Sequence, residues 1–206
     1  CDFPSLRRDT GVDRLASQFE AATRIEVKDF RVTRRASDRF SAKALKSDRS
    51  HEDYIEFDLG ASSWLEPVTG ENAEFRVTMY DPEALKQTHA PARHRYLVAR
   101  EIIDADVVIN VPKLKTHKKA GITGALKNAV GINGLKDYLP HHRKGSPESG
   151  GDCYARKSAF KTAGEACLDV ANRMDQRRWV AAVLGGAARA ATRLDEITGG
   201  DRNMEG

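Results

Sequence analysis

The sequence has few cysteines and no long apolar run. Cysteine occurs three times in 206 residues, at positions 1, 153 and 167, without a C-x-x-C pair or a four-cysteine pattern. This argues against a structural zinc site, an iron–sulfur cluster or a disulfide framework, so we expect no metal site and a reducing, cytoplasmic location. No apolar stretch approaches the roughly 20 residues that span a bilayer, so we expect no membrane association.

An initiator methionine and a hydrophobic signal segment are also missing from the start of the chain. The first residues, CDFPSLRRD, and the last, GGDRNMEG, are polar and do not read as the ends of a complete domain. We therefore expect an excised part of a longer chain. At this length, residues 1–206 are expected to form a single α/β domain.

Acidic residues are absent from a stretch of thirty, Val107 to Lys136, which carries six lysines and several glycines. The whole chain has a formal charge of +4, so these lysines account for the positive excess. A local positive field with glycines favours the binding of a small anion. Arginine and aromatic residues, which nucleic-acid readers commonly use, are missing from the stretch, so we expect no specific nucleic-acid binding.

Periodicity predicts the main elements. The pattern DVVINV, residues 106–111, is typical of a buried central strand, and a basic loop follows it. A polar insertion is expected at about 33–53, and the apolar face of the first long C-terminal helix is expected at Phe160, Ala163, Cys167 and Leu168. The predicted helices are 9–22, 95–104, 123–130, 156–174 and 178–196, and the predicted strands are 24–32, 53–60, 74–82 and 106–111. Together they predict a three-layer α/β domain with a mixed or mostly parallel sheet flanked by helices.

The basic loop supplies the candidate site, because open α/β sheets bind ligands beyond the carboxyl ends of their strands. His117 is the candidate catalytic residue, since histidine exchanges protons near neutral pH. The candidate anion-binding residues are Lys113, Lys115, Thr116, Lys118, Thr123, Lys127 and Asn128. GITGALKN is neither a Walker A loop nor a G-x-G-x-x-G motif, so no nucleotide or other cofactor is indicated. The alternative is a solvated basic loop without a ligand.

Secondary candidates lie in the irregular segment before the first long C-terminal helix. They are His141, His142, Asp152 and Cys153. A histidine pair can move protons, and a cysteine at a helix start can act as a nucleophile. A polar loop, a helix-capping Asp152 and an inert Cys153 explain the same residues.

The blocks NVPKLKTH and TGALKNAVG resemble domain of unknown function 362, an uncharacterised bacterial and archaeal family. The family pattern is a hydrophobic strand, PKLKTH, a short gap and T-x-x-x-KN-x-x-G. The matching residues are Pro112, Lys113, Lys115, Thr116, His117, Thr123, Lys127, Asn128 and Gly131. The later GINGLKDYLPHHRKGSPESGGD is similar to a subgroup often found beside surface-polysaccharide genes. Some relatives carry a ferredoxin-type cysteine module that this chain lacks, so the resemblance implies no electron-transfer role here.

These observations predict an enzyme domain that binds a small phosphorylated or carboxylated substrate, such as a sugar derivative, through the lysine-rich loop. The alternative is a non-catalytic binding module for nucleic acid or an acidic partner. An enzyme should gather Lys113, His117 and Lys127 around one concave pocket, whereas a binding module should spread its lysines over an exposed face. The sequence does not indicate an oligomeric state.

Overall fold

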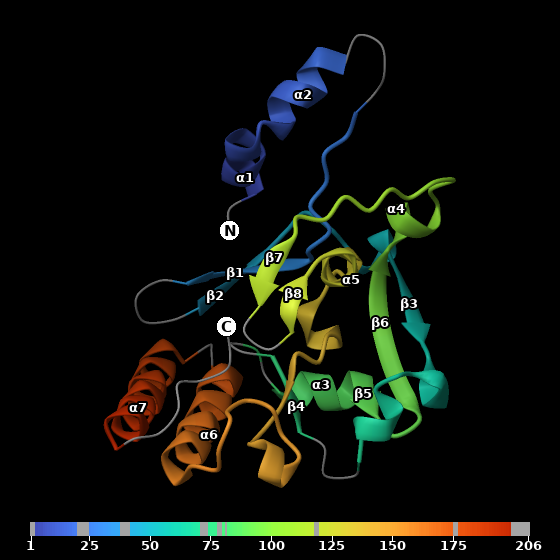
Figure 1. Ribbon diagram of the computed structural model, residues 1–206. Helices are drawn as coiled ribbons and strands as arrows, with labels where there is room; N and C mark the ends of the chain where they lie inside the picture. The colour runs from blue at the N-terminus through green and yellow to red at the C-terminus, as the bar shows by residue number, and fades with distance from the viewer. Residues whose placement is uncertain are drawn as a thin grey trace.

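The computed structural model describes residues 3–19, 25–37, 42–70, 74–77, 80, 82–117, 120–174 and 177–198. In these ranges the α-helices are α1 (Phe3–Thr10), α2 (Val12–Phe19), α3 (Pro82–Thr88), α4 (Arg100–Ile103), α5 (Ala125–Ala129), α6 (Ala159–Arg173) and α7 (Arg178–Ile197). The strands are β1 (Thr33–Ser37), β2 (Ala42–Lys46), β3 (Tyr54–Asp58), β4 (Phe75–Arg76), β5 (His89–Ala90), β6 (Arg93–Ala99), β7 (Lys115–His117), β8 (Gly121–Thr123) and β9 (His142–Arg143). Single 3-10 turns are η1 (His51–Asp53), η2 (Gly60–Ser62), η3 (Glu66–Val68), η4 (Val130–Ile132), η5 (Lys136–Tyr138) and η6 (Pro147–Ser149). The pair α1–α2 projects from the rest of the chain, while α6 and α7 lie side by side (Figure 1).

The strands form small antiparallel sheets, so the predicted three-layer domain with a mixed or mostly parallel sheet is wrong. The largest sheet has the order β3-β6-β5, and β1–β2, β4–β9 and β7–β8 are separate pairs. Every strand pairing among the described residues is antiparallel. Parallel neighbours need crossovers of a dozen or more residues, whereas only Pro91 and Ala92 separate β5 from β6.

The predicted central strand, residues 106–111, is also wrong. The segment has no regular structure and lies on the surface, with Val107 75% and Ile109 80% exposed. Apolar β-branched composition favours an extended chain, but a strand also needs a neighbour with which to pair. No strand in the described part of the chain pairs with this segment.

A strand replaces most of the helix predicted at 95–104. Strand β6 pairs with β3 from Tyr54 opposite Ala99 to Asp58 opposite Arg95. Helix α4 adds a single turn after it. His94 is buried on one face of β6 and Leu97 and Ala99 on the other, and pairing with two strands outweighs the weak helical pattern.

Among the described residues, four of the other predicted helices and strands are present, and two other predicted features are not. The structure confirms the strand at 53–60 and the helices at 123–130, 156–174 and 178–196. Residues 25–32 have no strand, and the polar stretch 33–53 contains the β1–β2 hairpin. Helix α2 falls within the predicted helix 9–22, of which residues 20–22 lie outside the described residues. Of the predicted strand 74–82, β4 forms the part at Phe75–Arg76, and residues 78, 79 and 81 lie outside the described residues.

Two small apolar clusters form the core. One contains Phe75, Val77, Tyr80 and Leu85, and the other contains Tyr54, Leu97 and Ala99, flanked by Phe30, Val32, Ile102, Leu135 and Tyr138. Fully burying a side chain of the size of Leu97 contributes about 1.5–3 kcal/mol. The clusters fix β3, β6 and the chain around Gly134, whose N–H donates to the Leu97 carbonyl at 2.8 Å.

Helix α6 buries its charged face, which corrects the predicted apolar face. Lys161, Glu165 and Asp169 are buried at helical spacing, whereas Phe160 is 44% exposed and Ala163 is exposed. Ser158 caps the helix by accepting the Lys161 N–H at 3.2 Å. Buried charges need partners of opposite sign, so this face is defined by ion pairs rather than by apolar packing.

None of the helices in the described residues is both long and apolar enough to cross a bilayer.

Candidate anion-binding site

The β7–β8 hairpin places three of the predicted site residues on one face. Lys115 lies opposite Thr123, and His117 lies opposite Gly121. Directly opposed residues share a face of an antiparallel pair, and residues two apart on a strand share it as well. Lys115, His117 and Thr123 therefore project together, while Thr116 projects from the other face.

Helix α5 brings Lys127 to the same place. Its Nζ lies 3.3 Å from His117 Nε2, and the Ala120 N–H points at His117 Nδ1 from 3.2 Å. Because Nδ1 accepts that hydrogen, a neutral ring carries its proton on Nε2. Two hydrogen-bond donors, the imidazole Nε2–H and the lysine amine, are thus held side by side.

The Asn128 side chain is hydrogen-bonded within the protein. Its Nδ2 donates to Asn110 Oδ1 at 2.7 Å, and Asn110 Nδ2 donates to the Ala125 carbonyl at 3.0 Å. These two bonds join the exposed segment before Lys113 to helix α5. Asn128 therefore holds the loop in place in this structure, and its amide does not point to the His117 face as a free group.

The lysines of the loop are solvent-exposed. Lys113, Lys115 and Lys127 are exposed, and His117 is half-buried. Lys118 lies outside the described residues. The structure brings Lys115, His117, Thr123 and Lys127 together, whereas Thr116 and Asn128 are directed elsewhere.

The secondary candidates gather around β9. Buried His142 has its Nδ1 3.6 Å from Asp152 Oδ1, and the rings of His141 and His142 lie 4.4 Å apart. Asp152 Oδ1 also accepts the Arg143 N–H at 2.8 Å. These residues line a concavity of about 260 Å³. The 3.6 Å contact between the carboxylate and the imidazole is longer than a hydrogen bond.

Cys153 and Asp152 do not lie at the start of the long helix as predicted. Helix α6 begins at Ala159 and is capped by Ser158. Cys153 is 1% exposed and its thiol donates to the Arg143 carbonyl at 3.3 Å. A buried thiol that is hydrogen-bonded to a backbone carbonyl and lies away from a helix start fits a structural role.

Sequence reasoning missed a cluster of buried ion pairs between β4 and α6. Arg76 lies 2.8 Å from Glu165 and 3.1 Å from Asp169, and Lys144 lies 3.1 Å from Asp169. Burial lowers the pKa of Lys144, but its bonds and charge contacts with Asp169 and Glu74 outweigh this and leave the pKa raised. The spacing of Lys161, Glu165 and Asp169 at every fourth position was the available signal.

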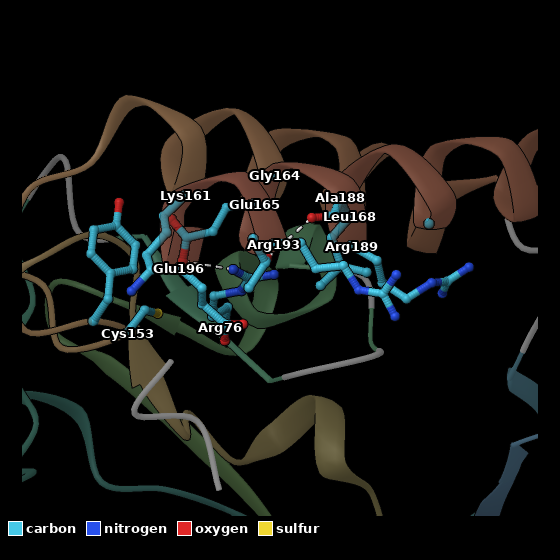
Figure 2. A pocket seen from close by; sticks show the side chains of 13 residues that line it. Arg76, Cys153, Lys161, Gly164, Glu165, Leu168, Ala188, Arg189, Arg193 and Glu196 are labelled. Atoms are coloured by element: carbon cyan, nitrogen blue, oxygen red, sulfur yellow. Dashed lines mark hydrogen bonds and ion pairs between the residues drawn. The ribbon is translucent and has the colours of Figure 1, made fainter. Parts of the chain in front are cut away.

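A cavity of about 430 Å³ adjoins this cluster (Figure 2). Arg76 and Lys161 reach it from β4 and α6, and Tyr154 also lines it. Burial raises the pKa of the Tyr154 hydroxyl, which is hydrogen-bonded with Thr162 at 3.0 Å. The phenol is therefore protonated at neutral pH.

Among the described residues, no group of three histidine, cysteine, aspartate or glutamate side chains is arranged to hold a metal ion. No curated protein and no solved structure matches the chain. Residues 61–205 match the family described as Domain of unknown function (DUF362), and because this is more than half of the sequence, the chain belongs to that family.

Proposed function

We propose that the chain binds a small phosphorylated or carboxylated molecule on the β7–β8 face, with His117 and Lys127 contacting the anionic group. The single observation that supports this most is the 3.3 Å separation of Lys127 Nζ and His117 Nε2. An anionic oxygen beside the pair can accept from both donors, and charge-assisted bonds of this kind are stronger than neutral ones.

Two neighbours extend the same face. Lys115 adds a second amine, and the Thr123 hydroxyl adds a donor or acceptor directly opposite it. The acid-free stretch around them leaves the positive field uncompensated locally. A sugar phosphate or sugar acid fits this chemistry, because its hydroxyls can bond to Thr123 while its charge meets the amines.

An enzymatic role places His117 at the reacting group. With Nδ1 occupied by the Ala120 N–H, the ring is set to donate a hydrogen bond from Nε2. Acting as a proton acceptor at Nε2 requires the other tautomer and the loss of the Ala120 bond. Binding and orienting the anion is thus the role that His117 performs without rearrangement, and proton transfer is the further step proposed for it.

Exposure of the lysines favours a second candidate, a module that binds an acidic macromolecule. Lys113, Lys115 and Lys127 all lie open to solvent. If the partner were nucleic acid, phosphate contacts by these lysines would give a steep salt dependence without sequence preference. We also propose a cytoplasmic location, which is supported only by the scarcity of cysteine.

Thermal shift and calorimetry with inorganic phosphate, sugar phosphates and dicarboxylates test the main proposal. A ligand at 100 times its Kd should raise stability by about 2.7 kcal/mol. Lys127→Ala and His117→Asn should each weaken binding at least ten-fold. The matched control is Lys136→Ala, an exposed lysine in η5 that is outside the hairpin.

If Lys136→Ala and Lys127→Ala lost equal amounts of binding affinity, the anion would be bound by general surface charge rather than at this site. Tight binding of an acidic polymer with no binding of any small anion would favour the second candidate. Unlike Asn, Gln can place an amide N–H near the position of the ring Nε2 and so keep the bond to the anion. Once a substrate is found, loss of turnover in His117→Gln with ligand affinity kept would therefore support proton transfer.

A further inference from the structure

The cavity between α6 and α7 is separate from the β7–β8 face. Its volume of about 430 Å³ lies in the range of small-molecule sites. Figure 2 shows side chains from both helices and from β4 converging on it. Nothing in the proposed function uses this space.

Small residues on facing helices create the walls. Gly164 of α6 and Gly185 and Ala188 of α7 line the cavity, together with Leu168. A Cβ at Gly164 would lie 3.3 Å from the Ala188 carbonyl oxygen, so the two helices approach closely there. Missing side-chain volume beside this contact leaves an apolar space that an apolar ligand group can fill.

The inner end of the cavity is polar, with its charges already matched. Arg76 and Lys161 are 2% and 3% exposed. Arg76 pairs with Glu165 at 2.8 Å, and Lys161 pairs with Asp195 at 3.3 Å. These ion pairs match the charges, so the inner end offers polar atoms without demanding a ligand of one sign.

The outer end carries unmatched positive charge. Arg189 and Arg193 are exposed and stand four residues apart on α7, which places them on one face of the helix. Neither side chain makes an ion pair or hydrogen bond with any residue that the structure describes, and the acid beside them is Glu196. Two guanidinium groups and one carboxylate leave the outer end, which we call the mouth of the cavity, with a net positive charge. The planar guanidinium N–H groups can donate two parallel hydrogen bonds to carboxylate or phosphate oxygens.

We infer that this cavity binds a small molecule with an apolar body and one terminal carboxylate or phosphate. The apolar body fills the space beside Gly164 and Ala188. Its anionic end bonds to Arg189 and Arg193 at the mouth. An inorganic anion lacks the apolar body and a neutral lipid-like molecule lacks the charge, so neither meets both requirements.

Calorimetry on the full chain with four probes tests both requirements. The probes are octanoate, octyl phosphate below its micelle concentration, octanol and inorganic phosphate. We expect octanoate and octyl phosphate to bind at least ten-fold more tightly than octanol or phosphate. Methyl-labelled NMR should place them by shifting the Leu168 and Ala188 signals.

Arginine variants test the mouth. Arg189→Gln with Arg193→Gln should weaken octanoate binding at least ten-fold and leave octanol binding unchanged. Arg177→Gln, which removes an exposed arginine before α7, is the matched control and should bind like the parent. Both substituted arginines are exposed, and circular dichroism with the thermal transition would establish that the variant folds.

The inference is overturned if no probe binds or if octanol binds as tightly as octanoate. It is also overturned if the double variant binds octanoate like the parent. Lys127→Ala should not change octanoate binding, so a failure here is distinct from a failure of the proposed function on the β7–β8 face.

Discussion

His89 Nδ1 lies 3.2 Å from His94 Nδ1, and both rings are buried. His89 Nε2 is 3.0 Å from the Tyr138 carbonyl oxygen, and His94 Nε2 is 2.9 Å from Glu66 Oε2. A carbonyl only accepts, so His89 Nε2 carries a hydrogen and, in a neutral ring, its Nδ1 accepts from His94. With two neutral rings and an ionised Glu66, His94 Nε2 and the carboxylate would both be acceptors. All three hydrogen bonds therefore form only if His94 and Glu66 share one additional proton.

Replacing Glu66 with Gln should remove the need for that proton. The amide NH2 in the position of Oε2 can donate to His94 Nε2, and the amide oxygen in the position of Oε1 can keep the Ala92 N–H, whose nitrogen lies 3.2 Å from Glu66 Oε1. We expect Glu66→Gln to be within about 0.5 kcal/mol of the parent at pH 8, while Glu66→Leu costs about 1–3 kcal/mol by leaving His94 unsatisfied. Urea unfolding of both variants measures this, and equal losses would contradict it.

Stability should fall with acid through His89. Burial lowers the pKa of His89 more than the Tyr138 carbonyl and the Asp58 charge raise it. The unfolded chain therefore binds a proton below about pH 6.5 that the folded chain resists, so unfolding free energy falls by up to about 1.4 kcal/mol per pH unit. His89→Gln should flatten the curve below pH 6.5, and an unchanged slope would show that another group titrates.

Glu101 should control the pH dependence of stability in a separate, more acidic pH range. Hydrogen bonds from Arg49, at 2.7 and 2.9 Å, lower the pKa of Glu101 to about 2 despite partial burial. A lowered carboxyl pKa contributes stability above the unfolded value, and that stability is lost as the pH falls from about 4.3 toward 2. Glu101→Gln should show a shallower loss in this window, measured by denaturation at constant ionic strength. The slope near pH 6.5 should be unaffected.

Arg76 should be among the costliest positions to replace. Arg76→Met would leave Glu165 buried without its cation, and breaking a buried pair in this way costs about 3–5 kcal/mol of unfolding free energy. The control is Lys86→Met, which removes an exposed pair with Glu83 at 3.1 Å and should cost no more than about 1 kcal/mol. Similar losses in both variants would mean that the buried pair is not special.

Gly134 should not tolerate a side chain. A Cβ there would lie 2.2 Å from Tyr54 Cε1, and bonds to Leu97 and Val32 hold the backbone in place. Gly134→Ala should cost about 1–3 kcal/mol or more through overpacking. Gly131→Ala, whose Cβ would meet nothing within 4 Å, should change stability by less than about 0.5 kcal/mol. Thermal unfolding of both compares them directly.

Sequence patterns predicted the elements that depend on local periodicity. The long helices α6 and α7 and strand β3 were found because each has a clear repeat or cap. The stretch at 106–111 failed because its composition favours a strand but pairing depends on the rest of the chain. Strand β6 was missed because its two neighbours, not its own pattern, determine it.

For the candidate site, the motif indicated a stretch of sequence but not the contacts that its residues make. His117 and Lys127 are ten residues apart and meet only because the β7–β8 hairpin turns back toward α5. Asn128 pairs with Asn110, a contact that no spacing rule indicates. Arg76 and Glu165 are even less accessible to sequence reasoning, because their pairing joins segments that are distant in the chain.

The docking of α6 onto the region around β4 has a consequence for the order of folding. The contacts that join them span 89 residues from Arg76 to Glu165 and 92 from Tyr80 to Asn172. Helices α6 and α7 are neighbours in sequence and can pair as a local hairpin, whereas closing such long loops costs entropy that no local contact offsets. We expect the helical hairpin to assemble early and its charged face to dock in a late, slow step. Before that step, Glu165 and Asp169 would be exposed to water without their partner Arg76.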